Sequence, residues 1–231
     1  MKKAITLSAA TLALLVAGAS GASVKAEPWS STGTIGFTAN TKTPPAITNP
    51  EVPGGTGPRG ILGELAIDYA SDLAFGKHEI SAKSETYFAD ADTTNFNRTP
   101  VGDFVEMHDL RGLGSGDKKG TQLNVTQSKQ FNNDSAELKG ATLSFSAGTA
   151  ANAGGGAYTP TAEAGFILKP GTAQKVMSTD GTVGQFLTSY GKAADYKGNT
   201  AGGPISLSVP SGSALAGDFS TTLVWDLVTA P

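Results

Sequence analysis

Short runs of alternating apolar and polar residues, separated by clusters of glycine, proline, asparagine and serine, constrain this chain most. Such alternation is typical of strands that bury one face. Beyond the first 26 residues no apolar series with helical spacing exceeds two turns, and 30 glycines and 12 prolines disfavour helices. The sequence therefore predicts an all-β fold, a two-sheet β-sandwich of immunoglobulin-like architecture with long loops. The alternating runs are residues 34–38, 65–69, 78–82, 104–110, 123–127, 141–147, 165–168, 205–209 and 219–228.

Two stretches have the composition of irregular connections. Residues 42–59 contain five prolines and three glycines, which predicts an extended, poorly ordered loop. Residues 147–157 include three consecutive glycines, which predicts a flexible loop.

The first residues have the pattern of a secretory signal. Met1-Lys2-Lys3 is a positive start, and residues 4–19 form an apolar stretch without charge. Val24-Lys25-Ala26 and Ser20-Gly21-Ala22 both fit a small-x-small cleavage site, and cleavage after Ala26 is favoured. We expect residues 1–26 to be a signal peptide and residues 27–231 to form a single domain. The last residues lack a hydrophobic tail with basic stop residues, so we expect attachment to a surface to be non-covalent.

Charge and cysteine content exclude several partner classes. Removing Lys2, Lys3 and Lys25 leaves 17 − 3 = 14 basic residues against 20 acidic ones, a net charge of −6. A nucleic-acid partner needs clustered basic residues and is not expected. The chain has no cysteine, so disulfides, thiolate metal sites and cysteine nucleophiles are excluded, and we expect no cofactor.

An ordered series of segments ends in Trp225-Asp226-Leu227. The series runs over most of the chain beyond the signal and resembles the WxL domain, a cell-surface module of Gram-positive bacteria. Its other parts are Gly63-Glu64-Leu65-Ala66-Ile67-Asp68-Tyr69, Leu73-Ala74-Phe75-Gly76, Val105, Met107, Asp109, Arg111-Gly112, Val125-Thr126-Gln127, Gln130-Phe131, Leu138-Lys139-Gly140-Ala141, Gly217-Asp218-Phe219 and Ala230-Pro231.

The resemblance implies a secreted, extracellular surface protein without catalytic activity. Such a protein attaches non-covalently to the peptidoglycan wall and works beside membrane-anchored WxL-interacting proteins. The motif residues, for wall binding or for the core, are Trp225, Leu227, Leu123, Val125, Asp109 and Arg111. Two other readings stay open: an adhesin-like structural subunit that binds host matrix or other proteins, and a secreted carbohydrate-active enzyme.

One position departs from the family pattern. The family usually has a first Trp-x-Leu motif, and here Thr121-Gln122-Leu123 stands in its place. Thr121 cannot bury the area of a tryptophan, so either its neighbours repack or that part of a binding surface is weakened. We expect Trp225 itself to be substantially buried, because the odd positions of 219–227 are mostly apolar.

Catalytic and metal-binding motifs are weak. His78-Glu79 starts a zinc-protease pattern, but Ala82 replaces the second histidine, so His78 is expected to be a partly buried structural residue on a strand that also carries Ile80. His108 is expected to be solvated. Ser115 lacks the glycines of a nucleophile elbow.

Two acidic groups remain. Asp90 and Asp92, with Asn95, resemble the start of a calcium loop that lacks its glycine and glutamate, so we expect a solvated turn and no metal. Asp109 and Arg111 are expected to form a charge pair that fixes the turn into residues 112–114.

Overall fold

The computed structural model describes residues 29–229 except 53, 115, 118 and 134. The chain divides into two units, residues 1–37 and residues 38–231. The predicted signal peptide, residues 1–26, lies outside the described residues, as does Ser115. Residues 29–37 of the first unit are extended and exposed and belong to no strand. The strand predicted at 34–38 is therefore wrong, since no neighbouring strand takes up its backbone hydrogen bonds.

The second unit consists of short strands joined by turns and loops. Two 3₁₀ turns, η1 (Phe96–Arg98) and η2 (Ala193–Asp195), are the helical elements among its described residues. All strand pairs are antiparallel. The strands are β1 (Ala46–Thr48), β2 (Thr56–Arg59), β3 (Leu65–Ala70), β4 (Glu85–Phe88), β5 (Phe104–Asp109), β6 (Thr121–Gln127), β7 (Thr142–Phe145), β8 (Thr149–Asn152), β9 (Thr161–Ala162), β10 (Phe166–Ile167), β11 (Ala173–Thr179), β12 (Gly184–Ser189), β13 (Ile205–Val209) and β14 (Leu223–Thr229).

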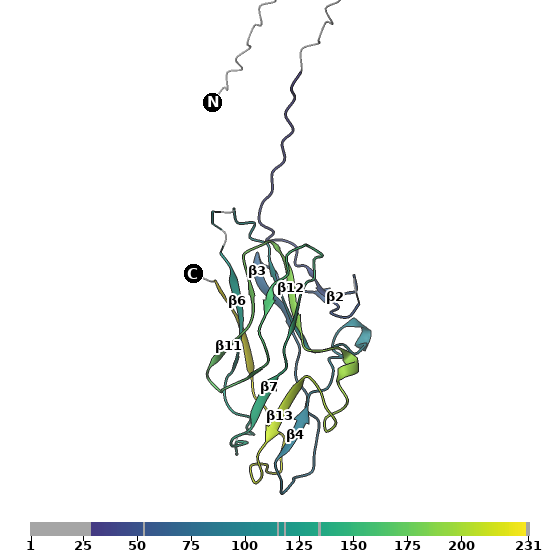
Figure 1. Ribbon diagram of the computed structural model, residues 1–231, viewed down its shortest axis with the longest axis vertical. Coiled ribbons are helices and arrows are strands. Elements are labelled where there is room, and N and C mark those ends of the chain that lie inside the picture. The colour runs from purple at the N-terminus through teal and green to yellow at the C-terminus, as the bar shows by residue number, and fades with distance from the viewer. Residues whose placement is uncertain (1–28, 53, 115, 118, 134, 230–231) are drawn as a thin grey trace, which may run out of the picture. The chain divides into compact units, whose positions relative to one another are not determined.

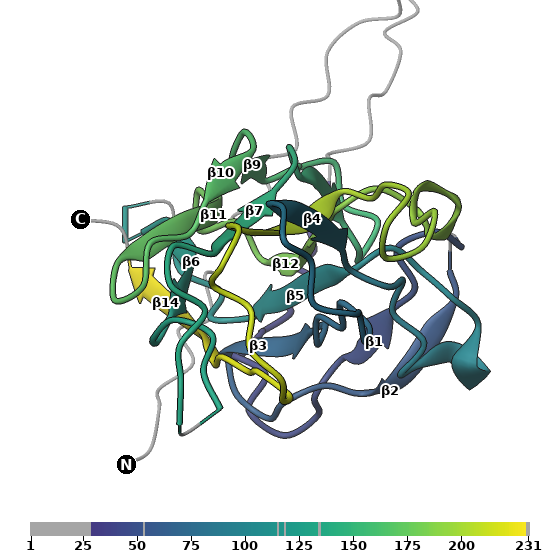
Figure 2. The ribbon, with the colours of Figure 1, turned by 90° about the horizontal axis from the view of Figure 1, so that it is seen from below.

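Three four-stranded sheets and one hairpin make up the second unit (Figures 1 and 2). The strand orders are β14-β6-β11-β9, β3-β5-β12-β8 and β10-β7-β13-β4, with β1-β2 as the hairpin. The predicted all-β sandwich is confirmed.

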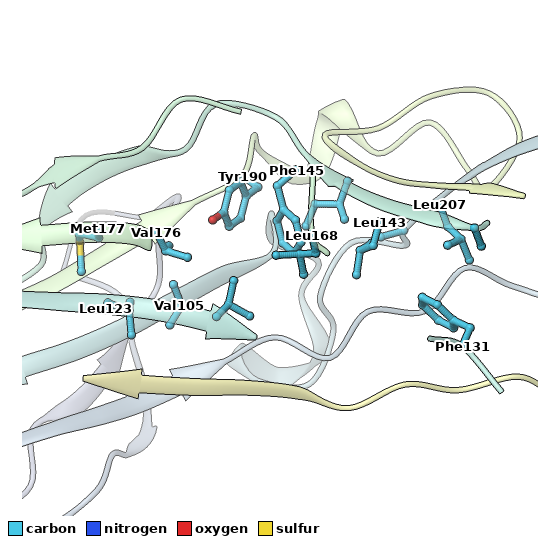
Figure 3. Close-up of a cluster of buried hydrophobic side chains, with 14 of the residues drawn as sticks. Val105, Leu123, Phe131, Leu143, Phe145, Leu168, Val176, Met177, Tyr190 and Leu207 are labelled. Carbon is cyan, nitrogen blue, oxygen red and sulfur yellow. The ribbon is translucent and has the colours of Figure 1, made fainter. Parts of the chain in front are cut away.

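One apolar core joins the three larger sheets. Figure 3 shows it running from Met177 and Leu123 at one end to Leu207 and Phe131 at the other. The predicted core residues Leu123, Val125, Leu143 and Phe145 are buried. Leu223 and Trp225 are partly buried and pack against this core.

Several local predictions are wrong. Residues 78–82 alternate but form no strand, and β4 starts three residues later and pairs with β13 instead. The two stretches predicted as irregular contain strands: β1 and β2 lie within 42–59, and β8 lies within 147–157 and pairs with β12. Prolines and glycines here mark the turns between short strands, and they do not exclude the strands themselves.

The β1–β2 hairpin explains why His108 is buried, although the sequence predicted a solvated residue. A second apolar cluster of Ile47, Val101 and Phe104 forms on the face of β5 that points away from the main core. The Thr48 N–H donates to Oε2 of Glu106 on that face, at 2.9 Å. His108 shares this face, so it is fully buried, and the prediction that it is solvated is wrong.

Candidate functional site

Strands β6 and β14 bring four motif residues together. They pair in antiparallel register, with Leu227 opposite Leu123 and Trp225 opposite Val125. Directly opposed residues of a sheet point to the same face, and this face is the one that packs on the core. The two Leu positions of the Trp-x-Leu motifs therefore contact the core as neighbours, from segments about 100 residues apart in the sequence.

Trp225 is only partly buried, because β14 is the edge strand of its sheet. The β6 residue opposite Trp225, Val125, has no exposed surface, nor does Leu123, the residue opposite Leu227. The side chain thus contributes to the core and also keeps a surface that solvent or a ligand can reach.

Asp109, Arg111 and Thr121 form one cluster at the end of β5 and the start of β6. The Arg111 Nε and Nη2 donate to the two carboxylate oxygens of Asp109 at 2.9 and 2.6 Å, which confirms the predicted charge pair. Nη2 also donates to the Lys119 carbonyl at 3.2 Å and to Oγ1 of Thr121 at 3.1 Å. The buried Thr121, which stands where a first Trp-x-Leu motif was expected to have its tryptophan, is therefore a hydrogen-bonding partner of this charge pair.

A groove with a volume of about 1070 Å³ opens beside Trp225. Its floor is apolar and includes the end of the core that Figure 3 shows around Phe131 and Leu207. Two irregular segments, residues 70–80 and 214–222, form its walls. Its apolar lining residues include Leu73, Phe75, Ile80, Phe131, Leu138, Leu143, Leu207, Val209, Leu215, Phe219, Leu223 and Trp225.

The rim of the groove is polar and aromatic. Lys77 Nζ lies 3.3 Å from Oδ1 of Asp218, an exposed ion pair that links the two walls. The ring of His78 stacks on that of Tyr87, with centroids 3.9 Å apart, and its Nε2 lies 2.6 Å from the Phe75 carbonyl oxygen. His78 is exposed and belongs to no strand, so the prediction of a partly buried strand residue is wrong.

The ionisable groups with raised pKa values lie away from the groove. Burial raises the pKa of Asp103 to about 8 and that of Glu106 to about 7. Burial lowers the pKa of His108, but the hydrogen bonds to Asp68 and to the Gly63 carbonyl outweigh it, so the net shift is upward. His108 Nδ1 lies 2.8 Å from Oδ2 of Asp68, and its Nε2 lies 2.9 Å from the Gly63 oxygen.

The Asp90–Asn95 segment is not a solvated turn throughout. Asp92 is buried and accepts hydrogen bonds from the Tyr69 hydroxyl at 2.5 Å and the Ser71 hydroxyl at 2.6 Å. In the described part of the chain, no group of three or more His, Cys, Asp or Glu side chains is arranged to hold a metal ion.

Comparison with known proteins decides the family. The profile of the WxL domain, described as a surface cell wall-binding domain, matches residues 24–231. This chain belongs to the WxL domain family. The WxL assignment makes it a cell wall-binding surface protein. No curated protein and no solved structure matches it. Among the described residues no helix is long and apolar enough to span a membrane.

The sequence pointed to part of this WxL site. It identified Trp225, Leu227, Leu123 and Val125, which the sheet brings together, and Asp109 and Arg111, which form a separate cluster. The groove walls were missed, although Leu73-Ala74-Phe75-Gly76 and Gly217-Asp218-Phe219 belong to the segments that resemble the family. Neither segment forms a strand, so periodicity gave no signal for their contact.

Proposed function

We propose that this WxL protein binds peptidoglycan directly through the groove beside Trp225, and that the binding is non-covalent and non-catalytic. The observation that carries the proposal is the position of Trp225: the family's signature tryptophan both packs against the core and lines the groove. Ligand sites are usually concave and mainly apolar, with a few polar groups that fix orientation.

The chemistry of the groove suits a wall polymer. Aromatic and aliphatic side chains on the floor can pack against the apolar faces of sugar rings. Lys77, Asp218 and Glu79 at the rim supply both signs of charge for the ends of short wall peptides. A ligand with sugar rings and charged peptide branches would use both features.

The placement of the perturbed ionisable groups favours binding over catalysis. Catalytic groups with shifted pKa values are found in the cleft where the reaction occurs. In this protein Asp103, Glu106 and His108 are buried in contacts that support the fold, and none of them lines the groove.

Co-sedimentation of the purified chain with protein-free peptidoglycan tests this function. Ile80→Ala and Leu215→Ala remove exposed apolar side chains from the groove, and Ile167→Ala removes a similarly exposed side chain from β10, outside it. We expect the two groove variants to bind several-fold more weakly with unchanged melting temperatures, and Ile167→Ala to bind as wild type.

Release of the bound protein tests the non-covalent part. Strong chaotrope should detach the protein without a wall hydrolase. Failure of the wild-type chain to sediment with pure peptidoglycan would contradict direct binding and would assign attachment to an envelope protein partner. Equal binding by all three variants would place the site outside the groove.

A further inference from the structure

Strand β14 has one edge with which no described strand pairs. In its sheet it lies last, with β6 on one side only. The Ser128 N–H donates to the Thr222 carbonyl at 2.9 Å, so even-numbered residues of β14 exchange hydrogen bonds with β6. In an antiparallel pair, the residues between these hydrogen-bonded positions direct their backbone N–H and C=O groups away from the partner strand. The N–H and C=O groups of Leu223, Trp225 and Leu227 therefore point to the open edge.

Strand β14 itself has none of the protections that an edge strand usually carries. Proteins protect sheet edges with lysine, proline, bulges or very short strands. β14 is seven residues long, has no lysine or proline, and pairs with β6 without a register shift. Its one charged side chain, Asp226, accepts a hydrogen bond from Asn124 of β6 at 3.2 Å. On its outer face Val224 and Val228 are 48% and 47% exposed.

A strand-like segment elsewhere in the chain has no sheet. Residues 34–38 read Thr-Ile-Gly-Phe-Thr, an alternation typical of a strand. They follow an extended course (Figure 1), and no described strand pairs with them. Ile35 and Phe37 are 81% and 87% exposed, which is unfavourable for two large apolar side chains on one face of a segment.

We propose that residues 34–38 of one molecule add as an extra strand to the β14 edge of a second molecule. Backbone hydrogen bonds from an added strand supply affinity, and alternate side chains supply register. With Ile35 and Phe37 on the outer face, they would lie beside Val224 and Val228 and bury apolar surface on both molecules. Thr34, Gly36 and Thr38 would then face inward, and this side of the segment has only small side chains. Small inward side chains suit a position near β3 of another sheet, which lies close to β14.

The contact would join different surfaces of the two molecules. A heterologous contact of this kind repeats from copy to copy unless the rotation closes it into a ring. A surface protein that assembles this way would present many wall-binding grooves in one array. The association itself does not depend on the wall, so its test is separate from that of the proposed function.

Complementation between two defective variants tests the proposal. In the chain of residues 27–231, Ile35→Asp/Phe37→Asp removes the donor strand and leaves the edge intact. Val224→Lys/Val228→Lys protects the edge and leaves the donor intact. Sedimentation velocity over a concentration series should show wild type associating and each variant remaining monomeric. An equimolar mixture of the two variants should form a one-to-one complex. Ile167→Lys, at an exposed apolar position on β10 that lies outside both elements and outside the groove, should associate as wild type.

Hydrogen exchange identifies the contact. The amides of Leu223, Trp225 and Leu227 should gain protection in the mixture and not in either variant alone. A wild-type chain that stays monomeric at all concentrations, or a mixture that forms no complex, would overturn the proposal. So would protection of these amides in a monomer, since that would place a strand of the same chain on the edge.

Discussion

Thr121 lies at the buried start of β6, at the position where the first Trp-x-Leu motif was expected to have its tryptophan. In this chain it accepts a hydrogen bond from Arg111, which also holds Asp109 through two nitrogen–oxygen contacts. The first motif position has thus become part of a polar cluster that joins the end of β5 to the start of β6. The second motif, at Trp225, is the only one of the two in which a tryptophan borders the groove.

The Asp109–Arg111 pair should stabilise the fold. The Asp109 side chain is 2% exposed and that of Arg111 is 13% exposed, so loss of the carboxylate leaves a largely buried guanidinium without its charge partner. We expect Asp109→Asn to lower the free energy of unfolding by about 2–3 kcal/mol. Urea denaturation measures it. Asp218→Asn, which breaks the exposed pair with Lys77, should give no measurable change, and equal losses in both variants would contradict this account.

Trp225 should affect both stability and binding. Because Trp225 is only partly buried at the sheet edge, its removal should destabilise the fold less than removal of a fully buried aromatic residue. We expect Trp225→Ala to lower the free energy of unfolding by about 2–3 kcal/mol. At temperatures where the variant remains folded, wall binding should still be weaker than for wild type. Calorimetry together with co-sedimentation separates the two effects. A variant with full binding whenever it is folded would make Trp225 a core residue alone.

At the scale of elements, the β1–β2 hairpin creates the buried environment that raises the pKa of Glu106. It covers the outer face of β5 and buries this carboxyl, whose Oε2 accepts the Thr48 N–H. Burial raises the pKa of Glu106 to about 7, and Asp103 nearby in the sequence has a pKa raised to about 8. The folded chain therefore holds protons that the unfolded chain releases near pH 4.

The expected consequence is a loss of stability as pH rises. Both carboxyls have folded pKa values above their unfolded ones, so the stability present below about pH 4 decreases through pH 7–8. The upward shift at His108 acts in the same direction at higher pH, because its stabilisation is lost as pH rises through the folded pKa. Melting temperatures at pH 5 and pH 8.5 should show the decrease.

Glu106→Gln isolates one contribution. At pH 8.5 the free energy of unfolding of this variant should exceed that of wild type by on the order of 2 kcal/mol, and its stability should depend less on pH. Glu79→Gln, an exposed position, should leave the pH dependence unchanged. A wild-type protein that becomes more stable from pH 5 to pH 8.5 would contradict the assigned burial effects.

Strands with an alternating sequence were predicted, and a strand without alternation was missed. β13 and β6 alternate along much of their length, and both were predicted. β12 was missed because its adjacent residues Phe186 and Leu187 point to opposite faces and both are buried. Residues 78–82 were predicted as a strand from alternation alone, but β4 takes the place beside β13.

Only the part of the candidate site that lies on strands could be predicted from the sequence. Trp225 and Leu227 follow from a motif within one strand, whereas the groove depends on contact between segments 70–80 and 214–222. Neither segment has a regular period, and an ion pair such as that of Lys77 with Asp218 leaves no sequence pattern. Burial of His108 likewise depends on a hairpin whose prolines and glycines predicted a loop.

At the scale of the whole molecule, the WxL fold combines a continuous core with a surface groove at one of its ends. The core residues Phe131, Leu143 and Leu207 also line the groove, so the rigid interior positions the binding surface. We therefore expect the groove to be largely formed before a ligand arrives, and wall binding to require little rearrangement of the strands.

The two tryptophans of the chain permit the most direct test of the groove as the wall-binding site. Trp225 lines the groove, and Trp29 is 95% exposed in residues 29–37. Both indole N–H signals can be followed by NMR while soluble peptidoglycan fragments are added. We predict a saturable shift of the Trp225 signal and an unchanged Trp29 signal. An unchanged Trp225 signal at fragment concentrations that saturate binding would contradict the account.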